Sequence, residues 1–220
     1  MPSRRAFLTR ALASGLTLAP ATRLFAANDF WNTKDPSTWT EDEIVQITSK
    51  SPWARAAVPG LKGAADPTGI SDGQAAQGGR GAGARRMSGP QYVTIRWESA
   101  QPIRDALRAP LAAEFDGHYV ISMTNLPLPP RGRGADASEN DDFLDRIQNG
   151  TTLQVKGRDP DEAGIARRTR IGSILFGFSK DYLPLTPADR EIIFKFDSDR
   201  LVLQTKFDAK EMMYHGKLAV

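Results

Sequence analysis

The chain has 220 residues, with 29 lysines and arginines against 26 aspartates and glutamates, and it has no cysteine. The lack of cysteine excludes disulfides, thiolate metal sites and a cysteine nucleophile. Four of the arginines lie in residues 1–27, which hold no acid, so 25 basic residues face 26 acidic ones in the rest. A net charge this close to zero gives no reason to expect nucleic-acid binding.

The first 27 residues have the layout of a signal peptide. Arginines precede a weakly apolar run, 11–19, which is shorter than the roughly 20 residues that a membrane span needs. Ala26 and Ala27 then offer a cleavage site. The start resembles the twin-arginine motif S-R-R-x-F-L, matched by Ser3, Arg4, Arg5, Phe7 and Leu8. An ordinary Sec signal is the alternative. We therefore expect a bacterial protein that the twin-arginine translocase exports folded, periplasmic or secreted, with no stable membrane anchor.

Residues 28–57 are expected to form a helical entry segment. Thr40 and Glu43 have the spacing of a capping box, which predicts a helix of about two turns. Ser51 followed by Pro52 predicts a second helix start. Three large hydrophobic side chains lie on these short elements: Trp31, Trp39 and Trp53. They are interpreted either as docking onto the rest of the protein or as a surface for a partner or ligand.

Residues 58–90 contain nine glycines and almost no large apolar side chains. Such a stretch cannot bury enough surface to offset its ordering entropy, so we expect a flexible linker or long loop. Within it, residues 69–73 match G-x-S-x-G. In a hydrolase this serine sits between a strand and a helix, and neither is predicted here, so the match is interpreted as accidental.

The remainder, 91–220, is expected to be a strand-rich globular domain. Residues 91–98 alternate apolar and polar side chains, which is typical of a strand with one buried face. Further strands are predicted at 118–124, 151–156, 167–179, 191–196 and 201–207, the last two forming a hairpin.

Short helices are predicted between and after these strands, at 99–107 and 139–148. Asp208 and Glu211 have the spacing of a capping box for a last helix. Together the elements predict an α+β fold that is mainly antiparallel β, sheet or sandwich-like, with short peripheral helices.

Four separated stretches carry a resemblance to a known group. They are the W-x-x-K-D-P-x-x-W-T-x-x-E-I run from Trp31 to Ile44, S-P-W-A at 51–54, R-W-E-S-A-x-P-I at 96–103 and M-Y-H-G-K-L at 213–218. The pattern resembles a family of uncharacterised bacterial exported proteins. The resemblance implies that entry segment, body and C-terminus form one unit. It implies no activity, and no catalytic residue can be carried over from it.

Candidate catalytic groups are sparse. The two histidines, His118 and His215, have no metal-ligand spacing, and neither a P-loop nor a dinucleotide fingerprint is present. We expect no metal, no cofactor and no assignable catalytic residue. The sequence therefore favours a non-enzymatic binding or accessory domain with a protein partner in the periplasm. The alternative is a periplasmic hydrolase of an unrecognised type that uses His118 or His215 with nearby carboxylates.

Overall fold

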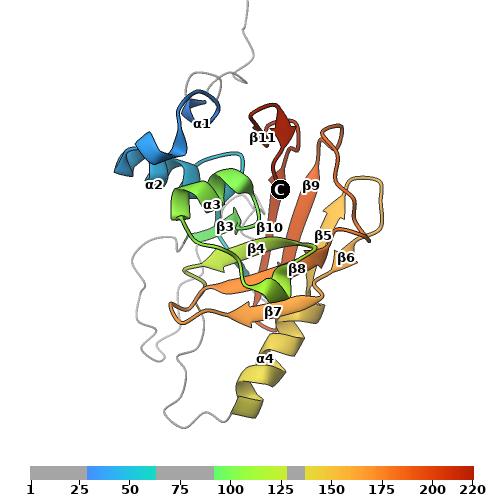
Figure 1. Ribbon diagram of the computed structural model, residues 1–220. Coiled ribbons are helices and arrows are strands. Elements are labelled where there is room, and N and C mark those ends of the chain that lie inside the picture. The colour runs from blue at the N-terminus through green and yellow to red at the C-terminus, as the bar shows by residue number, and fades with distance from the viewer. Residues whose placement is uncertain (1–28, 63–91, 128–136) are drawn as a thin grey trace, which may run out of the picture.

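The computed structural model describes residues 29–62, 92–127 and 137–220 (Figure 1). These residues form twelve strands and four α-helices. The strands make two five-stranded sheets, ordered β1-β3-β4-β8-β7 and β2-β10-β9-β5-β6, and a small sheet of β11 and β12. Every described strand pair is antiparallel. The protein is therefore α+β and mainly antiparallel β, as the sequence predicts.

The first sheet contains β1 (Ala54–Ala57), β3 (Val93–Trp97), β4 (His118–Thr124), β7 (Ile165–Arg168) and β8 (Ile174–Ser179). In β3 the side chains of Val93, Ile95 and Trp97 are fully buried, whereas Thr94 and Arg96 are half-buried. This confirms the predicted strand, because side chains of a strand alternate between its two faces. The central strand β4 is buried on both faces.

The second sheet contains β2 (Gly60–Leu61), β5 (Thr151–Val155), β6 (Asp161–Glu162), β9 (Ile192–Asp197) and β10 (Leu201–Phe207). The predicted hairpin is confirmed, with β9 and β10 in register from Val202 opposite Asp197 to Phe207 opposite Ile192. Ser198 closes its turn, because its hydroxyl both accepts from the Leu201 N–H and donates to the Leu201 carbonyl, each over 3.1 Å.

Aromatic rings join the two sheets into one core. Phe176 of the first sheet lies 6.1 Å, centroid to centroid, from both Phe194 and Phe196 of the second. Trp97 lies 5.7 Å from Phe207 in an edge-to-face arrangement. Full burial of one such side chain stabilises a fold by about 1.5–3 kcal/mol, so this layer supplies much of the packing energy in a chain without disulfides.

The helices lie around this sandwich (Figure 1). They are α1 (Phe30–Thr33), α2 (Glu41–Ser49), α3 (Gln101–Leu107) and α4 (Ala137–Asn149), with short 3-10 turns at Pro36–Thr38 and Ala113–Phe115. The predicted capping box is present at α2, where Thr40 and Glu43 each accept the other's backbone N–H. Figure 1 shows α1, α2 and α3 on one side and α4 at the opposite end, against β7. None of the described helices has the length and apolar character needed to cross a membrane.

The second helix predicted in the entry segment is wrong. The Ser51 hydroxyl donates to the Ile47 carbonyl over 2.6 Å and accepts from the Trp53 N–H over 3.2 Å. Ser51 therefore closes α2 instead of starting a new helix. The chain then passes through a bridge between Ser51 and Ala54 into β1.

Residues 167–179 form a hairpin and not the single strand that was predicted. β7 ends at Arg168 and β8 begins at Ile174, and the Thr169 N–H donates to the Ser173 carbonyl over 2.8 Å. Gly172 has a φ of 89°, which a glycine adopts readily. Ile171 is 89% exposed at the tip, although its apolar character suggested a buried strand position.

The C-terminal helix predicted after Asp208 is also wrong. The Asp208 carboxylate accepts the Lys210 N–H over 2.9 Å, which closes a turn. Two short strands follow, β11 (Met213–Tyr214) and β12 (Lys217–Leu218). His215 and Gly216 connect them with φ of 47° and 76°, the left-handed pair that a two-residue hairpin turn requires.

The predicted linker, 58–90, begins as part of the fold. Gly60 and Leu61 form β2 and pair with Val202 and Leu201 of β10, so the start of this segment is an edge strand of the second sheet. The G-x-S-x-G match at 69–73 lies outside the described residues. So do the twin-arginine motif and the cleavage site at 26–27.

Candidate functional site

The three tryptophans of the entry segment lie in the core. Trp31, Trp39 and Trp53 are 2%, 6% and 0% exposed. Their rings pack edge to face, with Phe30 5.2 Å from Trp31 and 5.5 Å from Trp39, and Trp31 5.6 Å from Trp53. The Trp53 indole N–H donates to the carbonyl of Ala219 over 2.6 Å. The docking interpretation is therefore right, and the interpretation of these residues as a partner surface is wrong.

The entry segment also binds the C-terminal hairpin directly. The Asn32 side chain accepts the His215 N–H over 2.8 Å and donates to the Met213 carbonyl over 3.4 Å. The Tyr214 hydroxyl donates to the Asp105 carboxylate over 2.9 Å. Burial, with the Asp105 hydrogen bond second, raises the pKa of Tyr214 well above its ordinary value, so this phenol stays a donor at physiological pH.

The two histidines lie in different settings. His118 begins β4, is half-buried, and places Nδ1 2.9 Å from the Asp116 carbonyl oxygen. A carbonyl can only accept, so in this contact the Nδ1–H is the donor. His215 is exposed in its tight turn, with its ring 4.2 Å from that of Tyr214. Neither histidine is among the residues that line the cavity at the start of β9.

One carboxylate interacts electrostatically with His118. Burial raises the pKa of the Asp161 carboxyl, Glu162 raises it further and His118 lowers it. Oδ2 of Asp161 is buried without a hydrogen-bond partner among the described residues. Ser179 is the cross-strand neighbour of His118, but its hydroxyl accepts the Asp181 N–H over 3.3 Å. The described residues contain no group of three or more histidine and acidic side chains placed to hold a metal ion.

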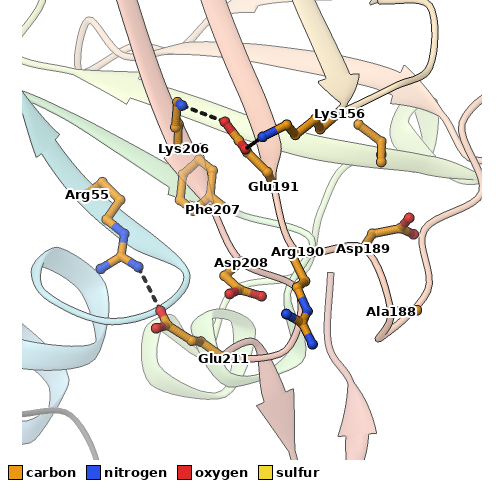
Figure 2. A pocket seen from close by; sticks show the side chains of 11 residues that line it. Arg55, Lys156, Ala188, Asp189, Arg190, Glu191, Lys206, Phe207, Asp208 and Glu211 are labelled. Carbon is orange, nitrogen blue, oxygen red and sulfur yellow. Dashed lines mark hydrogen bonds and ion pairs between the residues drawn. The ribbon is translucent and has the colours of Figure 1, made fainter. Parts of the chain in front are cut away.

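A cavity of about 790 Å³ lies where β5 and β10 end and β9 begins (Figure 2). The strand register produces it. Ile192 lies opposite both Val155 and Phe207, so the residues flanking these positions converge at one end of the second sheet. The charged lining residues are Arg55, Lys156, Arg190 and Lys206 on the basic side and Asp189, Glu191, Asp208 and Glu211 on the acidic side.

Glu191 is the centre of the best-connected ion-pair group in the cavity wall. Its carboxylate accepts from Lys206 and lies 2.9 Å from the Lys156 ammonium (Figure 2). Hydrogen bonds from Lys206 and then Lys156 hold the pKa of Glu191 below its ordinary value. The group is therefore a carboxylate at neutral pH and is poorly suited to donate a proton to a reacting molecule.

Two further carboxylates of the wall also have partners. Glu211 lies 3.1 Å from the Arg55 guanidinium, which comes from β1 (Figure 2). Asp189 is only 9% exposed. It accepts from the Arg158 guanidinium over 2.9 Å and from the Thr186 N–H over 2.7 Å. These contacts tie the segment before β9 to the rest of the sheet, so Asp189 serves the shape of the wall.

Arg190 and Asp208 differ from the other charged residues. Within the described ranges neither forms an ion pair, and the Asp208 carboxylate accepts a hydrogen bond only from the Lys210 N–H. Figure 2 shows both side chains at the same rim of the cavity. The wall thus presents one unpaired cation and one unpaired anion to whatever enters.

Sequence reasoning did not identify this site. Lys156 appears only as the end of a predicted strand, and Asp208 and Glu211 appear as a helix cap. The signal in the sequence is that charged residues directly flank three apolar runs, those of β5, β9 and β10. Only the register of β5, β9 and β10 shows that these flanks meet.

Comparisons of the chain with protein-family models, with curated proteins and with solved structures found no match. The family resemblance of the four sequence stretches therefore stays a prediction. What can be concluded about function depends on the fold and on the charged cavity between β1, β5, β9 and β10.

Proposed function

We propose that this protein is an exported periplasmic binding or accessory domain without enzymatic activity, and that the charged cavity is its binding site. The observation that carries the proposal is the composition of the wall. Its described lining includes no serine, threonine, histidine or tyrosine, and its central carboxylate is neutralised by two lysines. Such a wall suits recognition of a charged group better than nucleophilic or acid–base chemistry.

The volume of the cavity is consistent with binding. Small-molecule sites have volumes of about 300–1,000 Å³, and the cavity, at about 790 Å³, lies within this range. Val155, Ala188 and Phe207 contribute the apolar part of the wall, and the charged side chains around them would select a polar ligand.

Lysine labelling tests whether the cavity is occupied. Lys156 and Lys206 have side chains that are 73% and 59% exposed, so an amine-reactive reagent reaches both. The periplasmic extract is separated into a small-molecule fraction and a protein fraction. We expect one of them to reduce the labelling of these two lysines and to leave the labelling of the exposed Lys50 unchanged. Equal labelling of all three lysines with every fraction would show that the cavity is not a binding site.

The export part of the proposal is supported by the signal-peptide pattern of residues 1–27. Replacing Arg4 and Arg5 with lysine should retain the protein in the cytoplasm if the twin-arginine translocase carries it. Cell fractionation measures this directly. Export of the double variant at the normal level would favour an ordinary Sec signal instead.

A periplasmic hydrolase that uses His118 is the second candidate. The observation that favours it is the buried Oδ2 of the partly buried Asp161, unpartnered among the described residues, whose pKa burial raises and His118 lowers, together with Ser179 as the cross-strand neighbour of His118. A screen of ester, glycoside and phosphate substrates with the His118→Ala variant as control tests it. Turnover that depends on His118 would establish the hydrolase, and its absence would exclude this candidate.

A further inference from the structure

We propose that the cavity binds an acidic amino acid, either free or at the N-terminus of a short peptide. This inference is based on the binding function proposed above and names its ligand class. Arg190 would bind the ligand's α-carboxylate, or the carbonyl that replaces it in a peptide. Asp208 would bind the ammonium group. Lys156 and Lys206 would bind the side-chain carboxylate.

The charges that remain after internal pairing indicate this ligand. Arg55 is matched by Glu211, and Asp189 is matched by Arg158. Arg190 and Asp208 form no ion pair in the described part of the chain. A ligand that carries a carboxylate and an ammonium group at opposite positions is the simplest molecule that satisfies both.

The lysine pair accounts for the second carboxylate. Lys156 and Lys206 share a single acid, Glu191, so this part of the wall keeps one positive charge in excess. Each lysine ammonium has three N–H donors, so both keep donors for a ligand after pairing with Glu191. The cavity therefore offers two cationic positions and one anionic position, which is the complement of an acidic amino acid.

Other ligand classes fit the wall less well. A polyphosphate or nucleic acid would lie against the carboxylates of Asp208, Asp189 and Glu211, which would repel it. An apolar ligand would desolvate charged groups without replacing their hydrogen bonds. A basic amino acid would place its second ammonium group against the lysine pair.

Isothermal titration calorimetry on the purified protein tests the ligand class. The probes are L-glutamate, the dipeptide glutamyl-alanine, L-glutamine and L-lysine. We expect saturable binding of L-glutamate or of the dipeptide, at least tenfold weaker binding of L-glutamine, and none of L-lysine. The preference between the first two probes identifies the free amino acid or the peptide as the source.

Two variants locate the binding. Arg190→Gln and Asp208→Asn should each weaken binding of the preferred probe at least tenfold, and the asparagine keeps an acceptor for the Lys210 N–H. Arg170→Gln is the matched control, because Arg170 is also an exposed arginine without an ion pair in the described ranges but lies in the β7–β8 turn. Thermal unfolding of all three should match that of the parent protein.

The outcomes separate the two proposals. If extract protects Lys156 and Lys206 but neither acidic probe binds, the ligand class is wrong and the binding function stands. If L-lysine binds as tightly as L-glutamate, or if the Arg190 and Asp208 variants bind normally, the assignment is overturned. If no fraction protects the lysines and no probe binds, both proposals fail.

Discussion

Gly150 lies at the junction of α4 and β5, where the backbone of the β9–β10 hairpin comes closest to it. A Cβ added to Gly150 would lie 1.9 Å from the carbonyl oxygen of Asp197 and 3.0 Å from its carbonyl carbon. Real Cβ atoms essentially never approach a heavy atom closer than 3.0 Å. Gly150→Ala therefore forces one of two backbone segments to move by about 1 Å, because neither contact is with a flexible side chain.

The cost follows from the contacts that this movement disturbs. The Asp197 N–H donates to the Gly150 carbonyl over 2.9 Å, and the Gly150 N–H donates to the Arg146 carbonyl over 3.2 Å. Overpacking costs about 1–3 kcal/mol, and weakening of two hydrogen bonds adds about 1 kcal/mol. The lower entropy of the unfolded alanine chain offsets about 0.5 kcal/mol. We expect a net loss of about 1.5–3.5 kcal/mol, or roughly 3–14 °C in melting temperature for a protein of this size.

Urea and thermal unfolding followed by circular dichroism measure this loss. Gly164→Ala is the matched control, because the nearest atom to its added Cβ is the Gly177 carbonyl oxygen at 3.9 Å, an ordinary contact. The control should change the free energy of unfolding by less than about 1 kcal/mol. Equal stability of the two variants would show that the backbone of Asp197 does not lie as close to Gly150 as the structure places it.

Three other results are expected. Trp31→Ala should lower the free energy of unfolding by about 3–5 kcal/mol, because Trp31 is buried between Phe30 and Trp53; a variant with unchanged urea midpoint would contradict its place in the core. Trp53→Phe keeps an aromatic ring but loses the hydrogen bond to the Ala219 carbonyl, so it should lower the free energy of unfolding by about 1–3 kcal/mol. Proteases should also cleave the C-terminus of this variant faster. Cleavage at the parent's rate would mean that this hydrogen bond does not hold the C-terminus. The pKa of Glu191 is lowered by Lys206 and Lys156 from an ordinary value of 4.5, so its stabilising contribution is present above that value and is lost as the pH falls through the lower folded pKa. Urea titrations between pH 7 and pH 3 should therefore show a smaller acid-induced loss for Glu191→Gln than for the parent, and identical profiles would count against the ion-pair group.

Elements with local signals could be predicted from the sequence alone. The alternation in Val93–Trp97, the capping box of Thr40 and Glu43, and the turn between β9 and β10 depend on residues within one element or one turn. Side-chain periodicity and helix caps depend on residues only a few positions apart, so they can be recognised in the sequence. The mainly antiparallel class followed from these elements.

Three local patterns failed because a competing local or tertiary interaction was stronger than the predicted one. Ser51 has a helix N-cap signature, but its hydroxyl is used by the preceding helix. Asp208 and Glu211 have capping-box spacing, but Glu211 pairs with Arg55 from β1 and the chain turns into β11. Ile171 is apolar, but the turn around Gly172 exposes it.

The positions of the tryptophans and of the cavity depend on contacts between residues far apart in the sequence. Trp53 meets Ala219, and Arg55 meets Glu211, across more than 150 positions of sequence. The cavity arises because β5 and β10 both pair with β9, which brings Lys156, Glu191 and Lys206 to one end of the sheet. Strand order and register depend on how distant faces pack together, and no pattern within a single strand specifies its neighbour.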